Sequence, residues 1–127
     1  MRITGITYGL LRIPLRTPFK TALRTVEAIE DVVIRIQTNT GHVGFGEAPP
    51  TVAITGDSLE SILEALRGTI GPALLGRDIM DLQDNCVIVQ NAIPKNTSAK
   101  AAAEIALYDL FAQRAGKPLY QVLGGGI

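Results

Sequence analysis

The chain has 127 residues, and its 12 lysines and arginines balance 12 aspartates and glutamates, which leaves a formal charge of zero. The length suits a single domain, and 46% hydrophobic and 19% charged residues indicate a globular core and exclude wholesale disorder. The zero charge argues against nucleic acid or an anionic membrane as the main partner, because both need a basic excess. A (β/α)8 barrel needs about 200 residues or more, so no barrel enzyme fits within this chain.

Further features point to a cytoplasmic domain without disulfides. A single cysteine, Cys86, excludes an internal disulfide and a cysteine-based zinc cage. No apolar run approaches the roughly 20 residues of a membrane span, and residues 1–4 open into strand-like sequence without the apolar core of a signal peptide. We therefore expect a soluble, cytoplasmic location.

The first half of the chain has the pattern of β-strands. Residues 2–15 are rich in Ile, Thr, Leu and Tyr, and Pro14 predicts that the end of this strand lies at a sheet edge or leaves the sheet. Residues 31–37 alternate between apolar and polar, and a turn signal at 39–41 separates them from a further strand at 42–48. Together these segments predict an antiparallel meander of three strands.

The second half has the pattern of helices. Asp57 with Glu60 resembles a capping box at the start of the first helix. Further helices are predicted over 79–93 and 97–115, followed by a short turn at 119–123.

The helix over 97–115 carries a stripe of small residues, which predicts that a neighbouring element approaches its backbone closely. The stripe consists of Ala99, Ala102, Ala103, Ala106 and Leu110. Strands followed by helices predict an α+β fold, a three-stranded antiparallel meander with a bundle of about three helices on one face.

A connection between the first two strands, residues 17–25, combines aromatic, aliphatic and cationic side chains and is too long for a tight hairpin. Long connections of this kind are often lids or binding loops. A structural alternative is that Phe19 and Leu23 pack under the sheet while Lys20 and Arg24 face solvent.

A second connection, residues 49–56, places Val52 and Ile54 between a double proline and a glycine. It can be an ordinary strand-to-helix connection with one apolar anchor. If both connections lie at one end of the sheet, they form an apolar rim with Arg24 as a bidentate anchor for a carboxylate.

Other chemically reactive residues favour structural roles. His42 follows a turn glycine and is expected to face solvent, Glu47 is expected to bond backbone amides at a turn, and Asp109 to make a structural salt bridge or cap contact. The glycines around Phe45 do not form a dinucleotide-binding fingerprint, because they lie within a strand and no helix follows. No complete catalytic set is evident from the residues alone.

Several segments together resemble a known domain. Residues 101–110 and 116–125, with the strand end at 44–49, resemble the N-terminal capping domain of the enolase superfamily, and within it the muconate lactonizing enzyme subgroup. The segments 18–25 and 54–57 are most similar to those of dipeptide epimerases acting on L-Ala-D/L-Glu. The resemblance covers essentially the whole chain, residues 1–127.

The resemblance implies an α+β domain that closes over the mouth of a (β/α)8 barrel, which is absent from this chain. It implies that Arg24 lies near a substrate carboxylate and that Phe19 and Ile54 shape the apolar side of the pocket, with Thr25 and Thr55 beside them in the substrate-binding set. In this family a Lys-x-Lys strand, an opposing lysine and three carboxylates that bind Mg²⁺ belong to the barrel. We therefore expect no catalytic residue, metal ligand or cofactor in this chain, which alone should be inactive.

The predicted function is thus that of a specificity domain in an Mg²⁺-dependent dipeptide epimerase. Its expected partners are the dipeptide, its own barrel and further copies in a homo-oligomer, with neither nucleic acid nor membrane. One alternative is the capping domain of a muconate cycloisomerase or an o-succinylbenzoate synthase. Another is a self-associating interaction module, whose small-residue helix face and apolar loops form an exposed patch.

Overall fold

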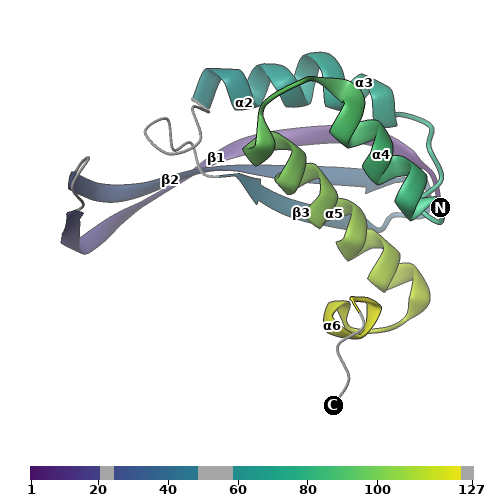
Figure 1. Cartoon of the computed structure of the whole chain (residues 1–127). Helices are drawn as coiled ribbons and strands as arrows, with labels where there is room; N and C mark the ends of the chain where they lie inside the picture. Colours follow the sequence, from purple (N-terminus) through teal and green to yellow (C-terminus); the bar gives the residue numbers. More distant parts are fainter. Residues whose placement is uncertain (21–24, 49–58, 124–127) are drawn as a thin grey trace.

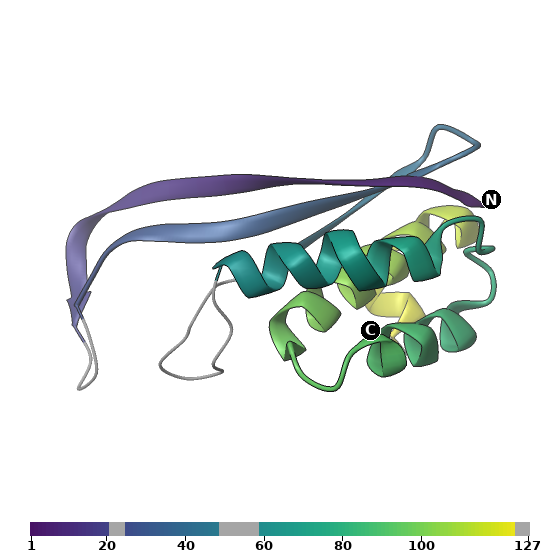
Figure 2. The ribbon, with the colours of Figure 1, turned by 90° about the horizontal axis from the view of Figure 1, so that it is seen from above.

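The computed structural model describes residues 1–20, 25–48 and 59–123, and for residues 11–20, 25–30 and 59 it describes the backbone only. A three-stranded antiparallel sheet forms one layer, and helices cover one of its faces as the second layer (Figures 1 and 2). The predicted α+β fold with strands before helices is confirmed.

The sheet has the order β1-β2-β3, with β1 at Ile3–Lys20, β2 at Thr25–Thr38 and β3 at Val43–Ala48. Strand β3 pairs with residues 32–37 of β2 only. Beyond this point β1 and β2 continue as a ribbon in which, among the described residues, no third strand takes part.

The expected long loop over 17–25 is wrong, because most of it belongs to the two strands. Strand β1 runs on to Lys20, and Phe19 pairs with Val26 across the ribbon. The strand passes Pro14 because β1 is an edge strand, where a missing backbone N–H is tolerated. The register shifts between Pro14 and Phe19, a stretch that also contains Pro18.

Residues 59–123 contain six helical segments, of which η1 is a π-helix that joins its two neighbours. They are α2 (Leu59–Ala65), η1 (Leu66–Ile70), α3 (Gly71–Leu74), α4 (Leu82–Ala92), α5 (Thr97–Ala115) and α6 (Leu119–Val122). Helix α5 has the predicted bounds. Helix α4 begins at Leu82, later than the predicted residue 79. The backbone amide of Ile79 instead donates to the Met1 carbonyl at 2.9 Å, which keeps this part of the chain extended beside the start of β1. The predicted cap Asp57 lies outside the described residues.

The core lies between the sheet and the helices. Val32, Ile34 and Ile36 of β2 are fully buried on one face, as their alternation predicts, and they belong to one cluster with Leu107 and Leu110 of α5. Because burial of such side chains is the main favourable term in folding, this cluster holds the two layers together.

Helix α5 lies directly against β3, which explains both its alanines and the strand's glycines. A Cβ placed on Gly46 would lie 1.9 Å from the Ala102 carbonyl oxygen, and one on Gly44 would lie 2.4 Å from that of Ala106. The small-residue stripe therefore permits the close approach that we predicted, and β3 is the neighbour.

Two side chains of α5 also bond the backbone of β3. The Phe45 amide donates to Asp109 Oδ2 at 3.0 Å, and Gln113 Nε2 donates to the Val43 carbonyl at 2.8 Å. These two bonds satisfy backbone N–H and C=O groups at the open edge of β3, which could otherwise pair with a further strand.

Candidate functional site

Two of the five predicted binding residues lie at one end of the sheet. Phe19 lies near the end of β1 and Thr25 opens β2, and the register places them on adjacent strands at the outer end of the ribbon. Arg24, Ile54 and Thr55 lie outside the described residues.

The described residues on either side of the second predicted binding segment lie where the ribbon begins. Strand β3 ends at Ala48, opposite Val32, where the ribbon departs from the three-stranded sheet, and α2 begins at Leu59 on the same side (Figures 1 and 2). From Val32 to Thr25 the ribbon extends roughly 20 Å further, at about 3.3 Å per residue. The described part of the first segment thus lies at the outer end of the ribbon, and the second segment leaves the described chain where the ribbon begins. That the two segments form one apolar rim stays a prediction.

A carboxylate pair lies where the ribbon begins. Glu47 of β3 shares a hydrogen bond with Asp31 of β2. Partial desolvation, followed by the negative charge of Asp31 and this bond, raises the pKa of Glu47. We expected Glu47 to bond backbone amides at a turn, and the structure instead gives it this second carboxyl group. Two carboxyl groups this close repel each other when both are ionised, so a proton shared between them or a cation beside them stabilises the pair.

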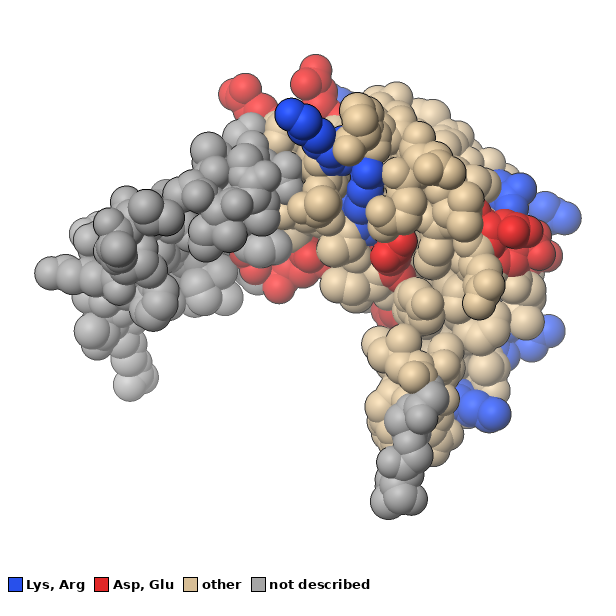
Figure 3. All heavy atoms as spheres, viewed as in Figure 1, with Lys and Arg blue, Asp and Glu red and all other residues tan. Residues whose placement is uncertain are grey.

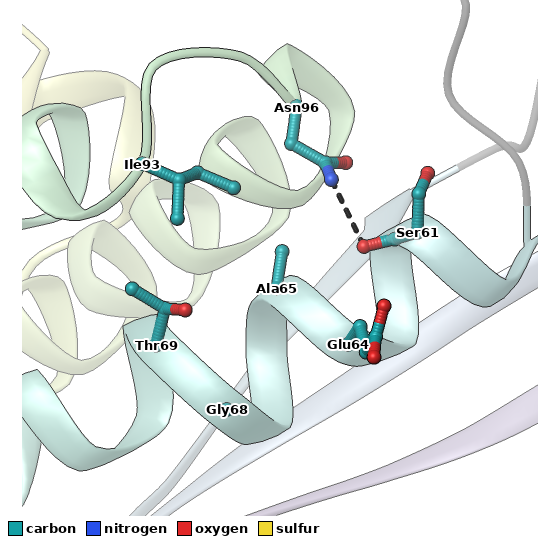
Figure 4. A pocket seen from close by; sticks show the side chains of 7 residues that line it. All are labelled: Ser61, Glu64, Ala65, Gly68, Thr69, Ile93 and Asn96. Carbon is teal, nitrogen blue, oxygen red and sulfur yellow. Dashed lines mark hydrogen bonds between the residues drawn. The ribbon is translucent and has the colours of Figure 1, made fainter.

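A hollow of about 350 Å³ lies between α2 and the connection from α4 to α5 (Figure 4). Asn96 reaches from this connection toward α2, and its Nδ2 donates to the Ser61 carbonyl at 2.9 Å. The lining is completed by Glu64, Ala65, Gly68, Thr69 and Ile93. The hollow therefore adjoins the first turn of α2, just after the predicted binding segment.

The remaining candidates have structural contacts. His42 is exposed in the turn before β3, with Nδ1 2.8 Å from Thr40 Oγ1. Asp109 accepts the Phe45 amide, in keeping with a structural role. Burial, and then the charge of Glu104, raise the pKa of the Cys86 thiol, which keeps it protonated and unreactive.

The described surface has mixed charges and no cluster suited to a metal ion. Positive and negative side chains are interspersed over the face in Figure 3, where the coloured part carries no broad patch of one sign. Within residues 1–20, 25–48 and 59–123, no three His, Cys, Asp or Glu side chains gather as a metal site. None of the helices in these ranges is long and apolar enough to cross a membrane.

The described residues thus form a three-stranded antiparallel meander with a layer of helices on one face. Residues 6–124 match the family described as mandelate racemase / muconate lactonizing enzyme, N-terminal domain. The chain belongs to this family, and it is a capping domain of the enolase superfamily.

Comparison with individual proteins shows which members of this family the chain resembles. The chain is 50% identical over 125 residues to an L-Ala-D/L-Glu epimerase of Clostridium acetobutylicum, covering 98% of this chain and 35% of the relative. The substrate-liganded L-Ala-D/L-Glu epimerase of Bacillus subtilis superposes with a TM-score of 0.94 at 49% identity, over 97% of this chain and 34% of that one. A dipeptide epimerase from Cytophaga hutchinsonii, complexed with Mg and D-Ala-L-Val, superposes with a TM-score of 0.93 at 36% identity, over 99% and 34%. The chain thus spans about a third of the length of these relatives.

Two features of this end of the molecule escaped the sequence reasoning. The first is the pairing of Asp31 with Glu47, which are diagonal neighbours once the register sets Val33 opposite Glu47. Continuing the antiparallel register outward from the predicted turn at 39–41 would have placed these two carboxylates near each other. The second is the bond from Asn96 to Ser61, which joins two helical segments and has no signal in the sequence.

Proposed function

We propose that this chain is the substrate-specificity domain of a dipeptide epimerase that acts on L-Ala-D/L-Glu. The proposal rests on a sequence identity of 50% over 98% of this chain to an L-Ala-D/L-Glu epimerase, together with a shared fold. The register of the ribbon also supports it, because Phe19 and Thr25 lie on adjacent strands at its outer end, where both strands can contribute to one binding surface.

In this proposal each predicted binding residue has a distinct task. The Arg24 guanidinium forms a bidentate pair with a substrate carboxylate. Phe19 and Ile54 form the apolar wall that excludes water, and Thr25 and Thr55 contribute polar contacts to the substrate. These groups hold the dipeptide so that its α-proton faces the base, and that positioning is a large part of the rate enhancement available to an enzyme.

The chemical step belongs, in this proposal, to a (β/α)8 barrel in the remainder of the protein. The described residues contain no cluster suited to Mg²⁺, so we assign the ion to the barrel and derive no step through it here. The Mg-bound relative supports Mg²⁺ in the whole protein. We further propose that the whole protein is a cytoplasmic homo-oligomer and that residues 1–127 alone are inactive.

The test is exchange of the α-proton of L-Ala-L-Glu in D₂O, catalysed by the full-length protein with Mg²⁺. Arg24→Ala removes a charge-assisted contact of about 1.5–3 kcal/mol, so kcat/KM should fall about 10- to 100-fold. The control Arg67→Ala removes an exposed arginine from η1, within the helical layer, and should leave kcat/KM unchanged.

Three results would contradict the proposal. An Arg24→Ala enzyme that keeps full kcat/KM would exclude the carboxylate contact, as expected instead for a cycloisomerase or a synthase with a different substrate. A full-length protein inactive on all dipeptides would exclude the substrate class. Exchange catalysed by residues 1–127 alone would contradict the assignment of the chemistry to the barrel.

A further inference from the structure

Helix α5 has a second apolar surface, on a side other than the one that Ala102 and Ala106 turn toward β3. Together with α6, which follows the end of α5 (Figure 1), this surface forms a groove of about 230 Å³. The side chains that line the groove are apolar or aromatic except for one glutamate. They are Ala101, Glu104, Ile105, Tyr108, Leu119 and Leu123.

Large apolar side chains are exposed in this part of the chain. Ile105 of α5 is 48% exposed, and in the segment 119–123 Tyr120 is 50% and Leu123 62% exposed. Single exposed apolar side chains are normal on a protein surface, whereas neighbouring ones mark a contact surface. The other large exposed apolar side chains among the described residues are distributed over other elements: Leu10, Phe45, Leu75, Met80 and Val87.

The size of the α5–α6 groove indicates which partner it fits. Residues 101–108 span about 10 Å along α5 at about 1.5 Å per residue, and α6 lies about one helix width away, so the surface measures roughly 200 Å². A stable dimer buries about 800 Å² on each partner. The groove is therefore too small to hold a second copy by itself. A partner tied to the same chain needs less area, because the tether gives it a high effective concentration.

A tethered partner of this kind is implied by the relatives. The chain spans 35% of the length of the Clostridium acetobutylicum relative, and the family that it matches is an N-terminal domain. In a protein of that length, the remaining two thirds follow residue 127. Leu123, the last described residue, lines the groove. Residues 124–127 can span at most about 15 Å, so the part that follows begins within reach of the groove.

We propose that the α5–α6 groove is the docking surface for the part of the same chain that follows residue 127, whose apolar side chains cover Ile105, Tyr108 and Leu123. This inference rests on the proposed function, in which that part is the barrel. The groove lies at the end of the molecule opposite the outer end of the ribbon (Figure 1). Docking at α5–α6 therefore leaves Phe19 and Thr25 available to the substrate.

The first test is photo-crosslinking in the full-length protein, with p-benzoylphenylalanine in place of Ile105. The matched control places the same group at Val87 of α4, which is 57% exposed and lies outside the groove. At position 105 we expect a cross-link to a peptide beyond residue 127, identified by mass spectrometry, and no band at twice the chain mass on a denaturing gel. Position 87 should give no cross-link to that part.

The second test compares Ile105→Lys with Val87→Lys in the full-length protein by differential scanning calorimetry at one scan rate. A lysine in a covered apolar groove is a buried charge without a partner, so Ile105→Lys should lower Tm by about 5 °C or more. Val87→Lys changes an exposed position and should leave Tm within about 1 °C.

The outcomes separate this inference from the proposed function. A band at twice the chain mass from position 105 would make a second copy the occupant and overturn the proposal. Cross-links confined to residues 1–127, no cross-link at all, equal cross-linking from positions 105 and 87, or an equal Tm of the two lysine variants would overturn it as well. If the protein turns over no dipeptide but position 105 cross-links beyond residue 127, the proposed function fails and the docking surface stands.

Discussion

Because α5 lies directly against β3, the stability of the fold should be very sensitive to the addition of a single methyl group at Gly46, as in Gly46→Ala. The added Cβ would lie 1.9 Å from the Ala102 carbonyl oxygen and 2.8 Å from its carbon. Carbon and oxygen atoms of this kind do not approach within about 3 Å. Either α5 or β3 must therefore move by about 1 Å, and both are backbone, so no side-chain rotation relieves the clash.

The cost follows from what moves with the helix. Overpacking alone costs about 1–3 kcal/mol. A shift of about 1 Å also breaks or lengthens the bonds from Asp109 and Gln113 to β3, now 3.0 and 2.8 Å long. Each contributes about 0.5–1.5 kcal/mol. We expect a loss of about 2–6 kcal/mol, a large part of the ~5–15 kcal/mol that stabilises a typical domain.

Urea unfolding of the 127-residue chain, followed by far-ultraviolet circular dichroism, measures this loss as a lower midpoint. The matched control is Gly9→Ala on β1, where an added Cβ meets nothing within 4 Å. It should change the free energy of unfolding by less than about 0.5 kcal/mol. If Gly46→Ala unfolds at the same urea concentration as Gly9→Ala, α5 does not lie against β3 as described and the reasoning is wrong.

Two further predictions concern carboxylates. Asp109→Ala removes the acceptor of the Phe45 amide at a partly exposed edge, so it should cost about 1 kcal/mol in urea unfolding, whereas Asp109→Asn keeps an acceptor and should cost less than half as much. Because the folded-state pKa of Glu47 lies above its unfolded value, its ionisation destabilises the fold as pH rises through and just above the ordinary glutamate range. Glu47→Gln should therefore raise Tm at about pH 7 and have no benefit near pH 4, and an equal gain at both would contradict the pairing with Asp31.

Much of the fold was predictable because its signals are local. The alternation of Val32, Ile34 and Ile36 gave the buried face of β2, and the stripe of alanines anticipated the close approach to α5. The length of the ribbon was not predictable, because Pro14 stops a central strand but not an edge strand. Which strand lies at an edge depends on pairing of the whole chain, which no local pattern encodes.

The site was predictable to a different extent. Resemblance selected residues in two separate segments, and of these residues the structure describes Phe19 and Thr25, at the outer end of the ribbon. The bond from Asn96 was not predictable, since asparagine before a helix normally indicates a cap. Only the position of α2 against the α4–α5 connection shows that the side chain is used elsewhere.

The position of the binding residues has an energetic consequence. Phe19 and Thr25 lie on the part of the ribbon where β1 and β2 pair with each other alone among the described strands, while the core cluster lies under the three-stranded part. A two-stranded ribbon is only marginally stable in water, so its outer end depends on what it contacts. Under the proposed function, substrate contact at Phe19 and Thr25 would use part of the binding energy to stabilise this two-stranded part. Substitutions there should alter KM with little effect on unfolding, whereas substitutions at the α5–β3 contact should do the reverse.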